Sequence, residues 1–80
     1  MMMYVDQVIR PEGNTSVQYN IIDELNVMVG TVRIDYNKGK GVWSFRDMIG
    51  RKIKNKATQA RMSRAVNHYM DHQYGHAATH

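Results

Sequence analysis

The chain has 80 residues, no cysteine and a formal net charge of +4, with 11 lysines and arginines against seven aspartates and glutamates. A chain of this length holds one domain, 1–80, and the absence of cysteine excludes disulfide cross-links, as expected in a reducing compartment. No apolar run reaches the roughly 20 residues that cross a bilayer, and no apolar targeting core is visible, so we expect a cytoplasmic protein with no membrane partner.

The first two predicted elements are strands joined by a turn. The sequence MYVDQVI at residues 3–9 predicts the first strand. The segment Pro11-Glu12-Gly13-Asn14 predicts a turn, because proline presets φ and glycine or asparagine tolerates positive φ. Residues 15–22 then alternate between apolar and polar side chains, which is the period-2 pattern of a half-buried strand.

The third and longest predicted strand spans residues 25–36. Gly30 falls in its buried row, which indicates a β-bulge or the close approach of a packed helix. A loop rich in glycine and lysine at 37–41 separates this strand from a short fourth strand at 42–45. Residues 3–45 are therefore predicted to form a meander of three or four antiparallel strands.

From residue 46 the pattern becomes helical, and apolar residues fall in two stripes at helical spacing. The stripes are Ile49, Ile53, Ala57 and Ala60, and Met62, Ala65, Val66, Tyr69 and Met70. At 100° per residue they lie on nearly opposite sides of one straight helix. Asn55 and Thr58 are both good N-caps, so we favour two helices, about 46–54 and 58–73, over one long helix.

Local signals predict where this helical region begins and ends. Ser44 or Asp47 is suited to cap its start, and Gly75 is a natural stop. Residues 46–73 then form a basic helical region and residues 74–80 a tail. The predicted fold is α+β, an antiparallel sheet of three to four strands followed by one long or two short C-terminal helices.

Positive charge is concentrated in the second half of the chain. Residues 1–30 carry one base and four acids, a net charge of −3, whereas residues 31–80 carry ten bases and three acids, a net charge of +7. Cations at helical or loop spacing, with short polar groups beside them, suit contacts with phosphates. We predict that this half binds nucleic acid or an acidic protein surface. The candidate residues are Arg46, Arg51, Lys52, Lys54, Lys56, Gln59, Arg61 and Arg64.

The segment Thr58-Gln59-Ala60-Arg61-Met62-Ser63-Arg64 resembles the recognition helix of Cro- and repressor-type helix-turn-helix proteins. In that family a Thr-Gln pair opens the helix that enters the major groove, and an apolar residue at the place of Met62 anchors it. Upstream, Ile49-Gly50 is similar to the apolar–small pair of the preceding helix. The resemblance implies groove contacts by Gln59, Arg61 and Ser63.

A second resemblance concerns the order of the elements. Three strands followed by a helix that opens with Arg51-Lys52 and Lys54 looks like a double-stranded-RNA-binding domain. The last helix of that family starts with lysines that span the phosphates of the major groove.

Signatures of enzymes are absent from the sequence. No local Ser/His/Asp arrangement occurs, and Gly39-Lys40-Gly41 lacks the further glycine that a dinucleotide-binding loop needs. Four histidines recur every four residues, at His68, His72, His76 and His80, but no carboxylate or cysteine completes a metal site. We therefore predict no catalysis, no cofactor and no metal.

The sequence thus predicts a small, non-catalytic regulator that contacts nucleic acid through its basic C-terminal half. The alternative is a small inhibitor or adaptor that docks on another protein, such as a nucleic-acid-handling complex. Short chains of this style are common in phages and mobile elements, and aromatic residues concentrate binding energy at such interfaces. A homodimer is also open, because a chain of this size buries a modest core.

Overall fold

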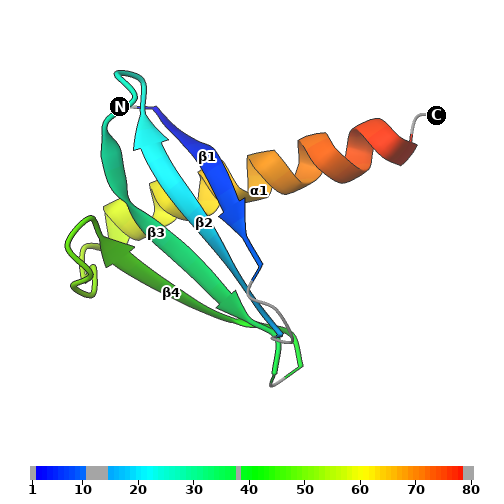
Figure 1. The fold of residues 1–80 in the computed structure, drawn as a ribbon, viewed down its shortest axis with the longest axis horizontal. Helices are drawn as coiled ribbons and strands as arrows, with labels where there is room; N and C mark the ends of the chain where they lie inside the picture. The colour runs from blue at the N-terminus through cyan, green and yellow to red at the C-terminus, as the bar shows by residue number, and fades with distance from the viewer. Residues whose placement is uncertain (1, 11–14, 38, 79–80) are drawn as a thin grey trace.

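The computed structural model describes residues 2–10, 15–37 and 39–78, with the side chains described as far as His72. The predicted turn at residues 11–14 lies outside this part of the chain. Within it, four strands precede one helix (Figure 1). The strands are β1 (Met3–Ile9), β2 (Ser16–Asp23), β3 (Met28–Asp35) and β4 (Val42–Asp47), and the helix is α1 (Lys56–Ala78).

The four strands form one antiparallel sheet in which each strand pairs with the next along the chain, in the order β1-β2-β3-β4. Figure 1 shows α1 crossing one face of this sheet, with its C-terminal part extending past β1. The opposite face of the sheet is not covered by α1, and we call it the open face. The predicted α+β arrangement is confirmed, with four strands and one helix.

The core lies between the sheet and α1, and it follows the alternation of the strands. Its buried side chains are Val17, Tyr19, Ile21, Val32, Ile34, Met62, Ala65 and Val66. Tyr69 and Met70 pack against this cluster, so the second predicted apolar stripe is confirmed as the side of α1 that faces the sheet. Full burial of a valine, isoleucine or methionine side chain stabilises the fold by about 1.5–3 kcal/mol.

The predicted helix over residues 46–54 is wrong, because this stretch completes β4 and then turns back beside it. The carboxylate of Asp47 accepts hydrogen bonds from the backbone N–H groups of Ile49 and Arg51, at 3.0 and 2.9 Å. Gly50 has a φ of 87°, which suits glycine in a tight turn. Asp47 therefore caps a turn and not a helix, and Ser44, the other predicted cap, lies within β4.

After this turn the chain runs antiparallel to β4 as a short extended segment. The backbone N–H of Asp47 donates to the carbonyl oxygen of Arg51 at 2.8 Å, and the N–H of Ile53 donates to the carbonyl oxygen of Phe45 at 3.0 Å. Ile53 packs against the core from this segment, whereas Ile49 is 65% exposed at the turn. The first predicted apolar stripe is therefore not a face of a helix.

A single helix begins after this segment, at one of the two caps that the sequence offered. The side-chain oxygen of Asn55 accepts a hydrogen bond from the backbone N–H of Thr58 at 3.0 Å, as an N-cap residue does. The prediction of Asn55 as a cap is confirmed, and that of two helices is wrong. The helix also continues past Gly75 through Ala78, so the predicted stop is wrong as well.

Gly30 lies at a point of close contact between strands. The register of β2 and β3 shifts beside it, because Ile21 pairs with Gly30 and Ile22 pairs with Met28, which leaves Val29 as an extra residue. A Cβ atom at Gly30 would overlap the carbonyl oxygen of Arg46 in β4. The predicted bulge is confirmed, and the close neighbour is the backbone of β4 and not a helix.

Candidate nucleic-acid interface

Three acidic residues are occupied by the turns of the sheet. Asp23, Asp35 and Asp47 each end a strand, and the Oδ1 atom of each accepts hydrogen bonds from backbone N–H groups of the turn that follows, at 2.8–3.0 Å. These carboxylates satisfy backbone donors that the turn would otherwise leave to water. Their negative charge is therefore held at the ends of the sheet.

Six cations of the chain's second half have no carboxylate partner among the described residues. Arg51, Lys52, Lys54, Lys56, Arg61 and Arg64 are all exposed, and none of them forms an ion pair with a carboxylate of the described chain. We call these six residues the basic surface. An exposed cation without a neighbouring carboxylate keeps its full attraction for an external anion, apart from screening by salt.

Lys52 of the basic surface lies beside β4, next to the candidate residue Arg46. Lys52 pairs with Arg46 across an isolated β-bridge. Arg46 and Thr31 are also cross-strand partners. Because side chains alternate along extended chains, and Phe45 and Ile53 pack on the core, Arg46 and Lys52 point to the open face of the sheet. Arg46 is partly restrained there, since its guanidinium donates to the carbonyl of Gly50 at 2.9 Å.

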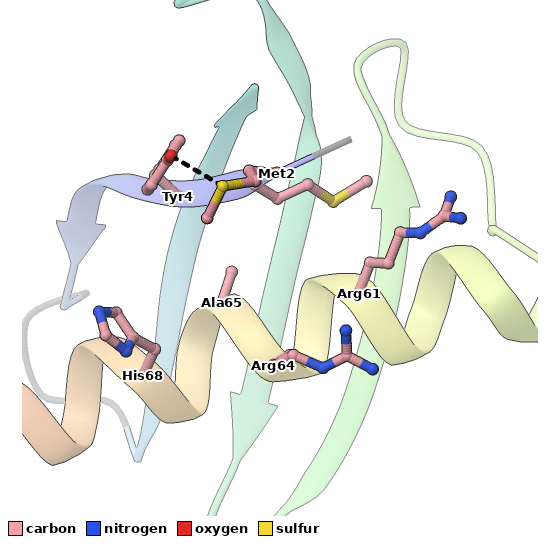
Figure 2. A pocket seen from close by; sticks show the side chains of 7 residues that line it. Met2, Tyr4, Arg61, Arg64, Ala65 and His68 are labelled. Atoms are coloured by element: carbon pink, nitrogen blue, oxygen red, sulfur yellow. Dashed lines mark hydrogen bonds between the residues drawn. The ribbon is translucent and has the colours of Figure 1, made fainter. Parts of the chain in front are cut away.

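Arg61 and Arg64 lie on the flank of α1 that faces the start of β1. There they line a hollow of about 230 Å³, which we call the β1–α1 hollow. The other lining residues are Met2, Met3, Tyr4, Ala65 and His68. Figure 2 shows Tyr4 on β1, and Met2 just before that strand, above the helix, with Arg61 and Arg64 to one side of Ala65 and His68 to the other.

Gln59 is held in place by the chain that precedes the helix. Its side-chain nitrogen donates to the carbonyl of Ile53 at 2.6 Å, and the side chain is half-buried. This bond ties the first turn of α1 to the extended segment. The predicted role of Gln59 in binding nucleic acid stays a prediction, but the hydrogen bond directs its amide nitrogen toward the protein.

The structure does not have the arrangement that the helix-turn-helix resemblance implies. In the described chain no helix precedes α1, because residues 46–55 form the end of β4, a turn and an extended segment. Arg61 is two residues from both Gln59 and Ser63, about 200° around the helix, so the three side chains do not share one face. The resemblance is local to the sequence and does not extend to the fold.

The resemblance to double-stranded-RNA-binding domains also fails at the residues that suggested it. Arg51, Lys52 and Lys54 lie in the extended segment before α1 and not in its first turn. Lys56 is the only one of the predicted lysines in the helix. These cations are therefore presented by two backbone conformations, an extended segment for Arg51, Lys52 and Lys54 and a helix for Lys56.

The open face of the sheet adds polar residues that the sequence analysis did not single out. Gln18, Asn20 and Gln7 form a chain of side-chain hydrogen bonds of 3.1 and 3.5 Å across the first two strands. Arg33 donates to the hydroxyl of Ser16 at 3.1 Å. Period-2 alternation assigns Ser16, Gln18, Asn20 and Arg33 to the face opposite the core, and the register shift between Val5 and Gln7 brings Gln7 to the same face.

The four histidines that recur every four residues are only partly described. The rings of His68 and His72 lie 4.6 Å apart between centroids, one turn of α1 from each other. The side chains of His76 and His80 lie outside the described part of the chain. Among the described side chains, no three histidine, cysteine or acidic groups come together in a way that could hold a metal ion.

No family model, curated protein or solved structure matches this chain. In the part of the chain that the structure describes, no helix combines the length and the apolar character required for crossing a bilayer.

Proposed function

We propose that this protein is a non-catalytic, cytoplasmic regulator that binds nucleic acid, and that its basic surface contacts the phosphate backbone. One observation carries the proposal. Six exposed lysines and arginines between residues 51 and 64 have no carboxylate partner in the described chain, while three of the acids are occupied in turns. Unpaired cations on two adjoining elements suit a polyanion better than a single small anion.

The physical consequence is a strong dependence of binding on salt. Each phosphate that the protein neutralises releases condensed counterions, so the logarithm of affinity falls linearly with the logarithm of salt concentration. The slope is about −0.9 per contact for duplex DNA and about −0.7 for single strands. If all six cations contacted phosphates, the slope would be roughly −4 to −5, which is easily measured.

The test is fluorescence anisotropy with labelled duplex and single-stranded oligonucleotides between about 50 and 300 mM salt. The triple variant Lys52→Gln, Lys54→Gln and Lys56→Gln should flatten the slope by about two to three units. Lys40→Gln is the matched control, because Lys40 is an exposed lysine in the loop at the other end of β4. Absence of binding to every oligonucleotide at about 50 mM salt would rule the proposal out.

A second candidate function, docking on another protein, is favoured by a different feature. The turn between β2 and β3 and the turn after β4 project from the same end of the sheet, because Gly30 pairs with Asp47 there. Leu25, Met48 and Ile49 are 77%, 64% and 65% exposed in these turns. A stoichiometric protein partner that survives nuclease treatment, and is lost with Leu25→Ser and Ile49→Ser, would favour this alternative.

A further inference from the structure

The β1–α1 hollow differs in chemistry from the rest of the basic surface. Its interior is formed by the aliphatic and thioether groups of Met2, Met3 and Ala65, and the ring of Tyr4 stands at its edge on β1. Tyr4 is 42% exposed, and its hydroxyl contacts the sulfur of Met2 at 3.5 Å. An apolar hollow with an accessible aromatic ring can take a flat apolar group.

The rim of the same hollow is cationic. Arg61 and Arg64 lie one turn apart on α1, and His68 follows Arg64 at the spacing of the next turn. Neither arginine has an ion pair or hydrogen bond with another described residue. Figure 2 shows the two guanidinium groups on the same side of Ala65, so positive charge is concentrated at one end of the hollow.

We infer that the β1–α1 hollow binds one unpaired nucleotide of a single-stranded nucleic acid. The base would enter the hollow against Tyr4 and the methionines, and the adjoining phosphate would lie at Arg61 and Arg64. The inference rests on the proposed function and refines it, because it gives the protein a preference for single strands over duplexes.

The preference follows from what each form of nucleic acid can present. In a duplex the faces of the bases are stacked on one another, so only phosphates and base edges reach a protein surface. A single strand presents base faces beside phosphates, and stacking on an aromatic side chain is worth about 1–3 kcal/mol per base. An apolar hollow with arginines at one end matches that pairing of a flat ring with an anion.

An acidic peptide is a poorer match to the same groups. Its carboxylates would satisfy the arginines, but its charge is carried on flexible side chains and leaves the hollow and the ring of Tyr4 without a defined occupant. Planar guanidinium groups bind carboxylates and phosphates alike through two parallel hydrogen bonds, so the choice between the two ligands depends on what fills the hollow beside the arginines.

The test compares oligothymidylate of about 15 nucleotides with a hairpin duplex of similar charge, by anisotropy at fixed salt. Wild-type protein should bind the single strand more tightly. Tyr4→Ala should weaken binding to the single strand by about 5- to 150-fold and leave duplex binding unchanged, whereas Tyr4→Phe should retain the preference. Arg61→Gln with Arg64→Gln should flatten the salt slope for the single strand by about 1.4 units.

Lys54→Gln with Lys56→Gln is the matched control, because it removes two cations of the basic surface that do not line the hollow. This variant should bind both oligonucleotides more weakly, and the ratio of the two affinities should stay unchanged. Equal binding of both ligands by wild-type protein, with Tyr4→Ala unchanged, would overturn the inference and leave the proposed function standing. If wild-type protein bound neither ligand, the proposed function itself would be overturned.

A measurement on wild-type protein guards against a variant that does not fold. Ultraviolet cross-linking to oligothymidylate, followed by peptide mapping, should identify peptides that contain Tyr4 or His68. Cross-links confined to residues 51–56 would contradict binding in the hollow. Displacement of oligothymidylate by a polyglutamate peptide at equal charge concentration, with the same dependence on Tyr4, would show that the hollow recognises acidic peptides instead.

Discussion

Replacing Gly30 by alanine should strongly destabilise the fold, although it adds one methyl group. The new Cβ would overlap the carbonyl oxygen of Arg46 and approach the Cα atom of Asp47 to 3.0 Å. Both atoms belong to the backbone of β4, so no side-chain rotation relieves the contact and the two strands must separate. Overpacking costs about 1–3 kcal/mol, and a backbone clash belongs at or above the top of that range.

We therefore expect the free energy of unfolding to fall by at least about 3 kcal/mol. A domain of 80 residues has roughly 4–12 kcal/mol in total, so Gly30→Ala should remove a large part of it. In thermal unfolding followed by circular dichroism, each kcal/mol corresponds to about 4–8 °C for a domain of this size. The expected decrease in Tm is at least about 12 °C.

Gly39→Ala provides the matched control for this prediction. Gly39 has a φ of 90°, but no atom lies within 4 Å of a Cβ placed there. Alanine at that position should cost only about 1–2 kcal/mol, through the strain of positive φ. If Gly39→Ala proved as destabilising as Gly30→Ala, the close approach of β4 would not be the reason for glycine at position 30.

Three further predictions concern the helix and the exposed turns. Met62 is fully buried, so Met62→Ala should lower the free energy of unfolding in urea by about 2–5 kcal/mol, and a loss under 1 kcal/mol would contradict its place in the core. Asn55→Ala should cost about 0.5–2 kcal/mol in the same assay, with Asn55→Asp close to wild type because aspartate also caps. Leu25→Ser should change stability by less than about 0.5 kcal/mol, since its side chain is 77% exposed, and a larger loss would show that the turn packs on the core.

The sheet could be predicted from the sequence because its signals are local. The alternation around Val17, Tyr19 and Ile21 assigns one face to the core, and the structure buries all three. The helix face could be predicted for the same reason, since Met62, Ala65, Val66 and Tyr69 recur at spacings of three and four, which only a helix brings to one face. Each pattern repeats often enough within its element to distinguish the strand period of 2 residues from the helix period of 3.6 residues.

The stretch after β4 could not be predicted in this way, because Ile49 and Ile53 are four residues apart. A spacing of four is compatible with a helix of 3.6 residues per turn and also with an extended chain of period 2. The deciding signal was the turn, in which Asp47 stands first and Gly50 fourth, as is usual in a type I turn. The backbone N–H of Gly50 donates to the carbonyl of Asp47 at 3.0 Å, which is the hydrogen bond that often closes such a turn.

The charged residues of the candidate site could be predicted from the sequence, but their arrangement in space could not. Composition identified the cations, and their exposure follows from helical and loop spacing. That Arg61 and Arg64 face Met2 and Tyr4 depends on the angle at which α1 crosses the sheet, which is set by packing between elements distant in sequence. No local pattern at Tyr4 indicates a contact with residues nearly sixty positions later.

The length of α1 gives the molecule two regions of unequal rigidity. The first turns rest on the sheet through Met62 and Val66, whereas the part beyond β1 has no strand beneath it. Amide hydrogens should therefore exchange at rates set by global unfolding near Val66 and by local fraying toward Ala78. A fluorophore or affinity tag joined after the helix would follow the part of α1 that does not pack on the sheet. It could therefore report on a bound ligand without disturbing the sheet.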